Sequence, residues 1–357
     1  MAESRERLQD GGRRQLPRGL GLTLCFVALI WAAAARLVST RSAAGIATRF
    51  HIELQQSLLE SVFLLFLVVI GFQTLEWLAT RGTPANFRGQ SALPLPWRRT
   101  TATEWFTGSA IGWSMSLAAV LPVFLMGHFH IRLNHGSGVF LGVLTTVATL
   151  LVATLAEEAI FRGYPFQVLA RSIGPAWAST VLSVIFALVL LAGNTPSNFG
   201  GALLNLFLFG VVLSIAYLRT HALWIGWGIH FAFRAVMVIL LGLPVAGRSD
   251  FASWTDGSLR GPRWLTGGSF GLDAALPTLI VLLIAIAVLH RATKEWAWSY
   301  TLPEIVSGGY EVFIAPPAAH AAMEKSAPPP PPPLVQIMAV APPPPIPALP
   351  TNPEREN

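Results

Sequence analysis

Charged side chains are scarce in this sequence. Asp, Glu, Lys and Arg make up 12% of its 357 residues, and hydrophobic residues make up 53%; soluble domains usually contain about 25% charged residues. Several apolar runs reach the ~20 residues that are needed to cross a bilayer. The composition therefore argues against an ordinary soluble domain. It predicts an all-α, polytopic transmembrane helix bundle with about eight helices.

Cysteine is almost absent as well. The single cysteine, Cys25, lies inside the first apolar run, so an intrachain disulfide and a cysteine-rich metal site are both excluded. The net charge of +6 comes from basic residues that cluster at the ends of apolar runs. This pattern favours anchoring in membrane lipid and indicates no nucleic-acid partner.

The apolar runs define the predicted membrane helices. These are residues 19–38, 57–79, 105–127, 138–160, 175–192, 201–218, 222–242 and 273–290. The first run also fits a signal peptide, because a basic segment precedes it. We favour an uncleaved helix, since the run is long and the chain soon re-enters the membrane.

Arginine placement predicts the orientation. The polar loop at 80–104 is arginine-rich and is expected in the cytoplasm. A second expected loop, at 37–54, runs against this bias because it would carry Arg36, Arg41 and Arg49 outward. The overall bias predicts a multi-pass membrane protein, in the inner membrane if the source is bacterial, with both termini cytoplasmic.

Composition divides the chain into four parts and shows no internal repeat. We predict a basic cytoplasmic arm at 1–18, membrane helices and a cytoplasmic loop at 19–100, a core at 101–295 and a proline-rich tail at 296–357. The tail cannot build a core and is expected to be disordered with polyproline II character. It could bind a partner domain, although most such tails are spacers.

The stretch "TLAEEAIFRGYPF" at 154–166 places three ionisable groups in an apolar part of the chain. On a helix over 150–171, Glu158 and Arg162 share a face, and Glu157 points about 100° away from Glu158. An intramembrane carboxylate is costly unless it faces a cavity, a partner or the bundle interior. This stretch alone is equally typical of a simple ion pair at a helix end.

A second polar group lies in "IGWGIHFAFRAVMVILLG", where His230 and Arg234 are four residues apart. Neither lies at the end of its apolar run, where a long side chain could reach the interface. A lone buried histidine is commonly just a hydrogen-bonded polar group. Together with the two glutamates, however, this pair indicates a polar cavity inside the bundle.

These motifs resemble one family. "EEAIFR" is similar to the EExxxR motif of the CPBP family, which includes type II CAAX prenyl endopeptidases and bacteriocin-processing membrane proteins. "YLRTHALWIGWGIHFAF" resembles a later family motif, in which an arginine-threonine turn leads into a tryptophan-containing helix with a histidine. "GLPVAG" and "GSFGLDAAL" are also similar to family segments, so the likeness covers most of 100–290.

The resemblance implies an intramembrane endopeptidase whose substrate is a peptide or membrane protein. Glu157 would activate the water molecule that attacks a peptide bond, and His230 would stabilise the developing oxyanion. Glu158 and Arg162 would be supporting partners. Preorganised donors aimed at an oxyanion contribute about 3 kcal/mol each, so this chemistry is physically reasonable.

Two positions depart from the family pattern. The family's FxxxH motif matches "SVIFALVLLAGN", but Leu190 stands where the histidine should be. A leucine cannot hold a water molecule or ligate a metal. Arg234 occupies the asparagine position of the HxxxN motif. Its permanent charge is expected to attract Glu157 and to make that carboxylate a poorer base.

No other histidine replaces the missing one. His221 is expected about 13 Å from His230 on the same helix. The histidines of "MGHFHIRLNHG" are expected in a solvated loop on the opposite side of the membrane. Because one histidine and two glutamates are too few ligands for an ordinary zinc or iron site, the sequence predicts no cofactor and does not support a divalent metal.

Two functions therefore stay open. The chain is either an endopeptidase that uses glutamate-activated water, or an inactive family member acting as a membrane scaffold, chaperone or immunity-type binding protein. In the second case Arg234 would lock Glu157 into a structural ion pair. A transporter is disfavoured because no pair of broken helices occurs in matching halves.

Overall fold

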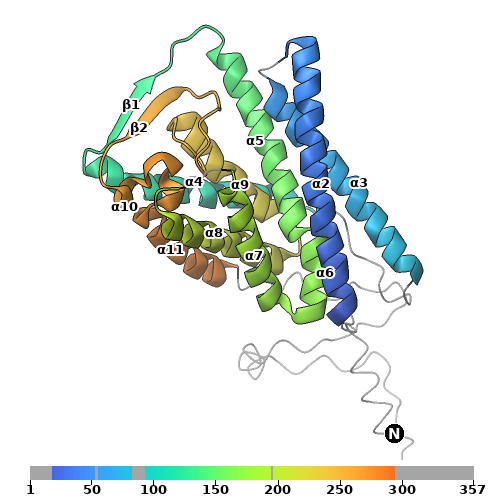
Figure 1. The fold of residues 1–357 in the computed structure, drawn as a ribbon. Coiled ribbons are helices and arrows are strands. Elements are labelled where there is room, and N and C mark those ends of the chain that lie inside the picture. Colours follow the sequence, from blue (N-terminus) through green and yellow to red (C-terminus); the bar gives the residue numbers. More distant parts are fainter. Residues whose placement is uncertain (1–17, 53–54, 83–92, 194–195, 294–357) are drawn as a thin grey trace, which may run out of the picture. The chain divides into compact units, whose positions relative to one another are not determined.

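A computed structural model describes residues 18–52, 55–82, 93–193 and 196–293 (Figure 1). The predicted proline-rich tail at 296–357 and nearly all of the predicted basic arm lie outside the described residues. Within the described part, the first two helices, α2 (Arg18–Phe50) and α3 (Gln56–Gly82), pack against each other.

The described chain is mostly helical, as the composition predicts. The further helices are α4 (Thr101–Leu125), α5 (Val139–Arg162), α6 (Tyr164–Ile173), α7 (Pro175–Leu191), α8 (Phe199–Thr220), α9 (Trp224–Ala235), α10 (Arg263–Thr266) and α11 (Leu276–Ala292). Five helical segments of the described part are long and apolar enough to cross a membrane, and three shorter apolar helices accompany them. The prediction of a multi-pass helical bundle is confirmed.

The first helix is longer than predicted. The sequence led us to expect a loop at 37–54, but α2 continues to Phe50. The segment after Arg36 contains no proline, and its hydroxyl groups bond back to the helix: Ser39 donates to the carbonyl oxygen of Ala35, and Thr48 to that of Ala44. Arg36, Arg41 and Arg49 therefore all lie within this helix and not in an outward loop.

The predicted helix over 150–171 is interrupted. α5 ends at Arg162, and Gly163 has a ψ of −132°, which is outside the helical region. Pro165 then stands in the first turn of α6, where a missing backbone N–H costs little. The break leaves Arg162 fully buried at the end of α5.

A small sheet was not predicted. β1 (Phe129–Leu133) pairs antiparallel with β2 (Thr255–Leu259), with Phe129 opposite Leu259. His130, expected in a solvated loop, lies on β1. Because the partner strand follows more than a hundred residues later, no local pattern could reveal the pairing. Among the described residues, no group of three potential metal-ligating side chains occurs.

α4 packs closely against α9 through glycines. A β-carbon on Gly108 would meet the carbonyl oxygen of Ile225, and one on Gly112 would meet that of Ile229. The missing side chains thus let two backbones approach, which is a common way for membrane helices to associate. This contact sets the position of α9, which carries His230 and Arg234.

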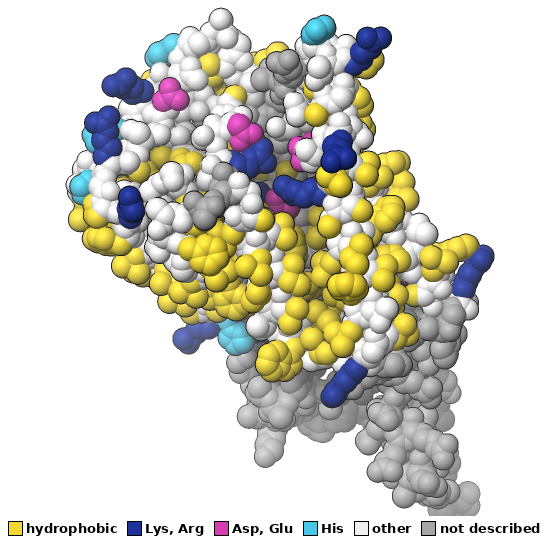
Figure 2. Space-filling view, in the orientation of Figure 1, with side chains coloured by type: hydrophobic (Ala, Val, Ile, Leu, Met, Phe, Trp, Pro, Cys, Tyr) yellow, Lys and Arg dark blue, Asp and Glu magenta, His cyan; other side chains and the backbone are white. Residues whose placement is uncertain are grey.

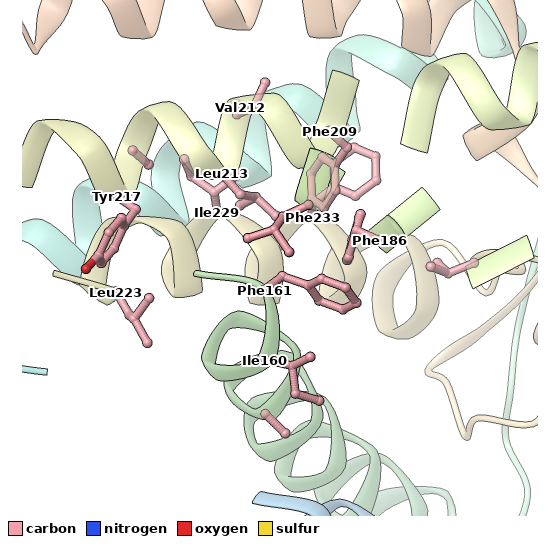
Figure 3. Packing of buried hydrophobic residues seen from close by; sticks show 14 of the residues in the cluster. Ile160, Phe161, Phe186, Phe209, Val212, Leu213, Tyr217, Leu223, Ile229 and Phe233 are labelled. Carbon is pink, nitrogen blue, oxygen red and sulfur yellow. The ribbon is translucent and has the colours of Figure 1, made fainter. Parts of the chain in front are cut away.

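An aromatic cluster fills the space between four helices (Figure 3). Phe161 of α5 meets Phe186 of α7 edge to face, with ring centroids 5.2 Å apart. Phe209 of α8 lies 5.1 Å from Phe233 of α9. These large side chains bury apolar surface and fix the helices that bear the polar residues.

Candidate active site

Glu157 and Arg234 form an ion pair between α5 and α9. Nη1 of Arg234 lies 3.1 Å from Oε1 of Glu157, and Nη2 lies 3.0 Å from Oε2. Each side chain is 12% exposed. The guanidinium therefore lies close to both carboxylate oxygens, and its Nη1 donates a hydrogen bond to Oε1.

His230 lies deeper in the bundle than this pair and is fully buried. Its Nδ1 is 2.7 Å from Oε1 of Glu158, and its Nε2 is 3.5 Å from Oε2 of Glu157. The rings of Phe186 and Phe209 pack edge to face against the imidazole. The histidine thus connects both glutamates and is held by aromatic packing.

Arg162 completes the buried group. Its Nη1 lies 3.5 Å from Oε1 of Glu158, and its Nη2 donates a hydrogen bond of 2.9 Å to the carbonyl oxygen of Gly210 on α8. Both Arg162 and Glu158 have no exposed surface. A buried charge needs such partners, because its desolvation is otherwise very costly. Glu158, Arg162 and His230 therefore form a charged core that joins α5, α8 and α9.

A cavity of about 90 Å³ adjoins Glu157. Its polar wall contains Arg36 of α2, Glu157, Arg234 and Arg248, and its apolar wall includes Leu190 of α7. Figure 2 shows basic and acidic side chains gathered at a hollow above a broad band of hydrophobic side chains. The volume holds several water molecules but no peptide segment, so a peptide could enter only if the walls moved apart.

A loop after α9 forms one wall of the cavity. Ala246 adopts a φ of +48°, in the left-handed region that alanine rarely occupies. Its N–H donates a hydrogen bond of 2.7 Å to Oδ2 of Asp273. Burial raises the pKa of the Asp273 carboxyl above its ordinary value. Nearby, hydrogen bonds from Arg248 hold the pKa of Asp250 below its usual range.

The structure brings the predicted residues Glu157, Glu158, Arg162, His230 and Arg234 together in one cluster. Leu190 borders the cavity, as the motif alignment requires. His230 is not among the residues that line the cavity, but its Nε2 lies 3.5 Å from Oε2 of Glu157, which does line it.

The expectation for His221 needs correction. His221 does not open the helix of His230; it caps α8 with a φ of +50°, and α9 begins at Trp224. The sequence also did not point to Arg36, Arg248 or Asp273. Of these, only Arg36 carried a signal, as a charge near the end of the first predicted helix, and we counted it with the loop expected at 37–54.

Together these features define a multi-pass helical membrane protein whose bundle encloses a cluster of glutamate, histidine and arginine side chains. Residues 138–236, from the turn before α5 through α9, match the family model of the type II CAAX prenyl endopeptidase Rce1-like proteins. This region is thus similar to the Rce1-like domain of the CPBP membrane-protease family, in agreement with the resemblance of the motifs. No curated protein and no solved structure matches the chain.

Proposed function

We propose that the walls of the Glu157 cavity move apart to bind a peptide segment within the membrane, and that the chain does not hydrolyse this peptide efficiently. It would then act as a scaffold, chaperone or immunity-type binding protein that keeps a protease fold. The family match supports a peptide as the ligand, since the matched residues include both glutamates, Leu190 and His230.

The contact between Arg234 and Glu157 carries this proposal. A general base must accept a proton from water, and both oxygens of Glu157 face a permanently charged guanidinium at 3.0–3.1 Å. The ion pair stabilises the ionised carboxylate and opposes proton transfer to it. Leu190 adds to this effect because it offers no hydrogen bond to a water molecule beside Glu157.

A second candidate is an endopeptidase with Glu157 as the general base and His230 as its partner. The observation that favours it is the distance of 3.5 Å between Nε2 of His230 and Oε2 of Glu157, at the edge of the cavity. In this case substrate binding would have to displace Arg234 from the carboxylate. Glu158 and Arg162 would support the site without contacting substrate.

The deciding experiment uses the full-length protein in lipid nanodiscs and a set of quenched fluorescent membrane peptides. We compare the wild type with Glu157→Gln, Leu190→His, Arg234→Asn and the Leu190→His/Arg234→Asn double variant. Leu188→His is the matched control, because Leu188 lies on the same helix and is 48% exposed. Fluorescence anisotropy of the labelled peptides measures binding separately.

We expect the wild type to bind peptides and to cleave them no faster than Glu157→Gln. The double variant should gain cleavage, and Leu188→His should not. Wild-type cleavage that is lost in Glu157→Gln would instead establish the endopeptidase. A lack of peptide binding by every variant would contradict both candidates.

We also propose that both termini face the cytoplasm. Arginines near the ends of apolar segments at 81, 98–99, 219 and 291 support this orientation. Reporter fusions after residues 52, 134 and 293 test it. If the fusion shows that residue 293 lies outside the cytoplasm, the proposal is contradicted.

A further inference from the structure

A second, larger pocket lies apart from the glutamate cluster. It measures about 510 Å³ and is formed by the segment before α4 and the first turns of α4 and α9. Four indole side chains line it: Trp97, Trp105, Trp224 and Trp227. The remaining wall includes Arg98 and Arg99. The Glu157 cavity and this pocket share no lining residue.

The indoles are held in place by one another and by the backbone. Trp224 lies 6.1 Å from Trp97 and 5.8 Å from Trp227, and Trp105 lies 5.9 Å from Trp227, measured between ring centroids. The Nε1–H of Trp224 donates to the carbonyl oxygen of Pro96, and that of Trp227 to Leu151. These contacts preorganise an aromatic surface, which lowers the entropic cost of binding an apolar group.

The pocket lies where two membrane helices begin. Tryptophan and arginine side chains at such positions sit at the level of lipid headgroups. Trp97 is 87% exposed, so the pocket opens to its surroundings and is not sealed inside the bundle. Its position and its indoles fit the glycerol and upper acyl region of a phospholipid.

The charges beside the indoles favour an anionic ligand. Arg99 is exposed and makes no ion pair with any described residue. The N-terminus of α4, a helix of 25 residues, adds a partial positive charge next to Thr101 and Ala102, which line the pocket. A cationic ligand would be repelled here, and a phosphate would be attracted.

One carboxylate lies close to this site. Glu104 is buried, accepts a hydrogen bond of 2.7 Å from the hydroxyl of Thr100, and lies 4.0 Å from Nη1 of Arg98. Arg98 in turn donates to the carbonyl oxygen of Thr220. The charge of Glu104 is thus balanced locally by Arg98, and Arg99 is left to contact a ligand.

We propose that this pocket, which we call the tryptophan pocket, binds an anionic phospholipid. The phosphate group would contact Arg99 and the start of α4, and the acyl chain would lie on Trp97, Trp224 and Trp227. The proposal does not depend on whether the Glu157 cavity binds or cleaves a peptide.

Native mass spectrometry of the full-length protein tests this with dioctanoyl phosphatidylglycerol and dioctanoyl phosphatidylcholine. We expect the wild type to bind phosphatidylglycerol more tightly than phosphatidylcholine. In Arg99→Gln the ratio of the two affinities should fall about fivefold. Arg132→Gln is the control, because Arg132 is an exposed arginine on β1, outside the tryptophan pocket. Trp97→Ala should weaken binding of both lipids.

Two results would overturn the proposal. One is an unchanged lipid preference in Arg99→Gln while the melting temperature stays that of the wild type. The other is competition by inorganic phosphate or glycerol phosphate as effective as that by phosphatidylglycerol, which would assign the site to a free phosphate compound. In detergent solution, phosphatidylglycerol with brominated acyl chains should also quench indole fluorescence more strongly than phosphatidylcholine with the same chains.

Discussion

Arg234 contacts both carboxylate oxygens of Glu157, at 3.1 and 3.0 Å, and so links α9 to α5. The two residues are 77 positions apart in the chain. Removing one member of a shielded pair of this kind is costly, because the remaining charge has lost its partner. The contact therefore affects the fold as well as the chemistry of Glu157.

We expect Arg234→Gln to destabilise the protein by about 3–5 kcal/mol, since it leaves the largely buried Glu157 carboxylate without its paired charge. The Glu157→Gln/Arg234→Gln double variant should lose much less than the sum of the two single variants. These losses in stability are measured by unfolding each variant in detergent and recording the fraction of the protein that stays folded. Purely additive losses would show that the pair is not coupled.

Arg162 should not tolerate lysine. Lysine has a single ammonium group and cannot contact Glu158 and the carbonyl oxygen of Gly210 in the geometry of the guanidinium fork. We expect Arg162→Lys to lower the melting temperature strongly, with a loss of about 3 kcal/mol or more. Arg171→Lys, at an exposed position of α6, is the matched control. If both variants melt alike, the buried arginine has no special role.

Gly112 should not tolerate alanine either. A methyl group there would meet the carbonyl oxygen of Ile229 and push α9 away from α4, which we expect to cost about 1–3 kcal/mol. Gly45→Ala is the control, because nothing lies within 4 Å of a β-carbon on Gly45 of α2. Alanine favours a helix over glycine by about 0.5–1 kcal/mol, so this control should be neutral or stabilising. Thermal unfolding of both variants decides the comparison.

Asp273 should make stability depend on pH. Burial raises its pKa in the folded state, so the folded protein holds this proton more tightly than the unfolded chain does. Stability that is present below the ordinary aspartate pKa of about 3.9 is then lost as the pH rises through the raised value.

Asp273→Asn tests that dependence. The amide oxygen can still accept the N–H of Ala246, and no ionisation occurs, so this variant should lose less stability than the wild type between pH 4 and pH 8. Melting curves at the two pH values measure the difference. Asp256→Asn, at an exposed position of β2, controls for the loss of one carboxylate. A wild type and an Asp273→Asn variant with the same pH dependence would contradict the expectation.

The sequence predicted the helical bundle and the polar cluster well, for a local reason. Apolar runs and the spacing of Glu158 and Arg162 are properties of neighbouring residues, and the structure keeps both. The helix boundaries were less predictable. A few polar residues after Arg36 suggested a loop, yet side chains such as Ser39 bond to the backbone and the helix continues.

By itself, the sequence determined the multi-pass helical class, the resemblance to a membrane-protease family and the two departures at Leu190 and Arg234. Only the tertiary structure decided that His230 lies behind Glu157, outside the cavity, and that Arg36 helps to line it. The reason is physical: hydropathy and helix spacing act along neighbouring residues, whereas these positions depend on how distant helices pack, through glycines and aromatic rings that carry no local signal.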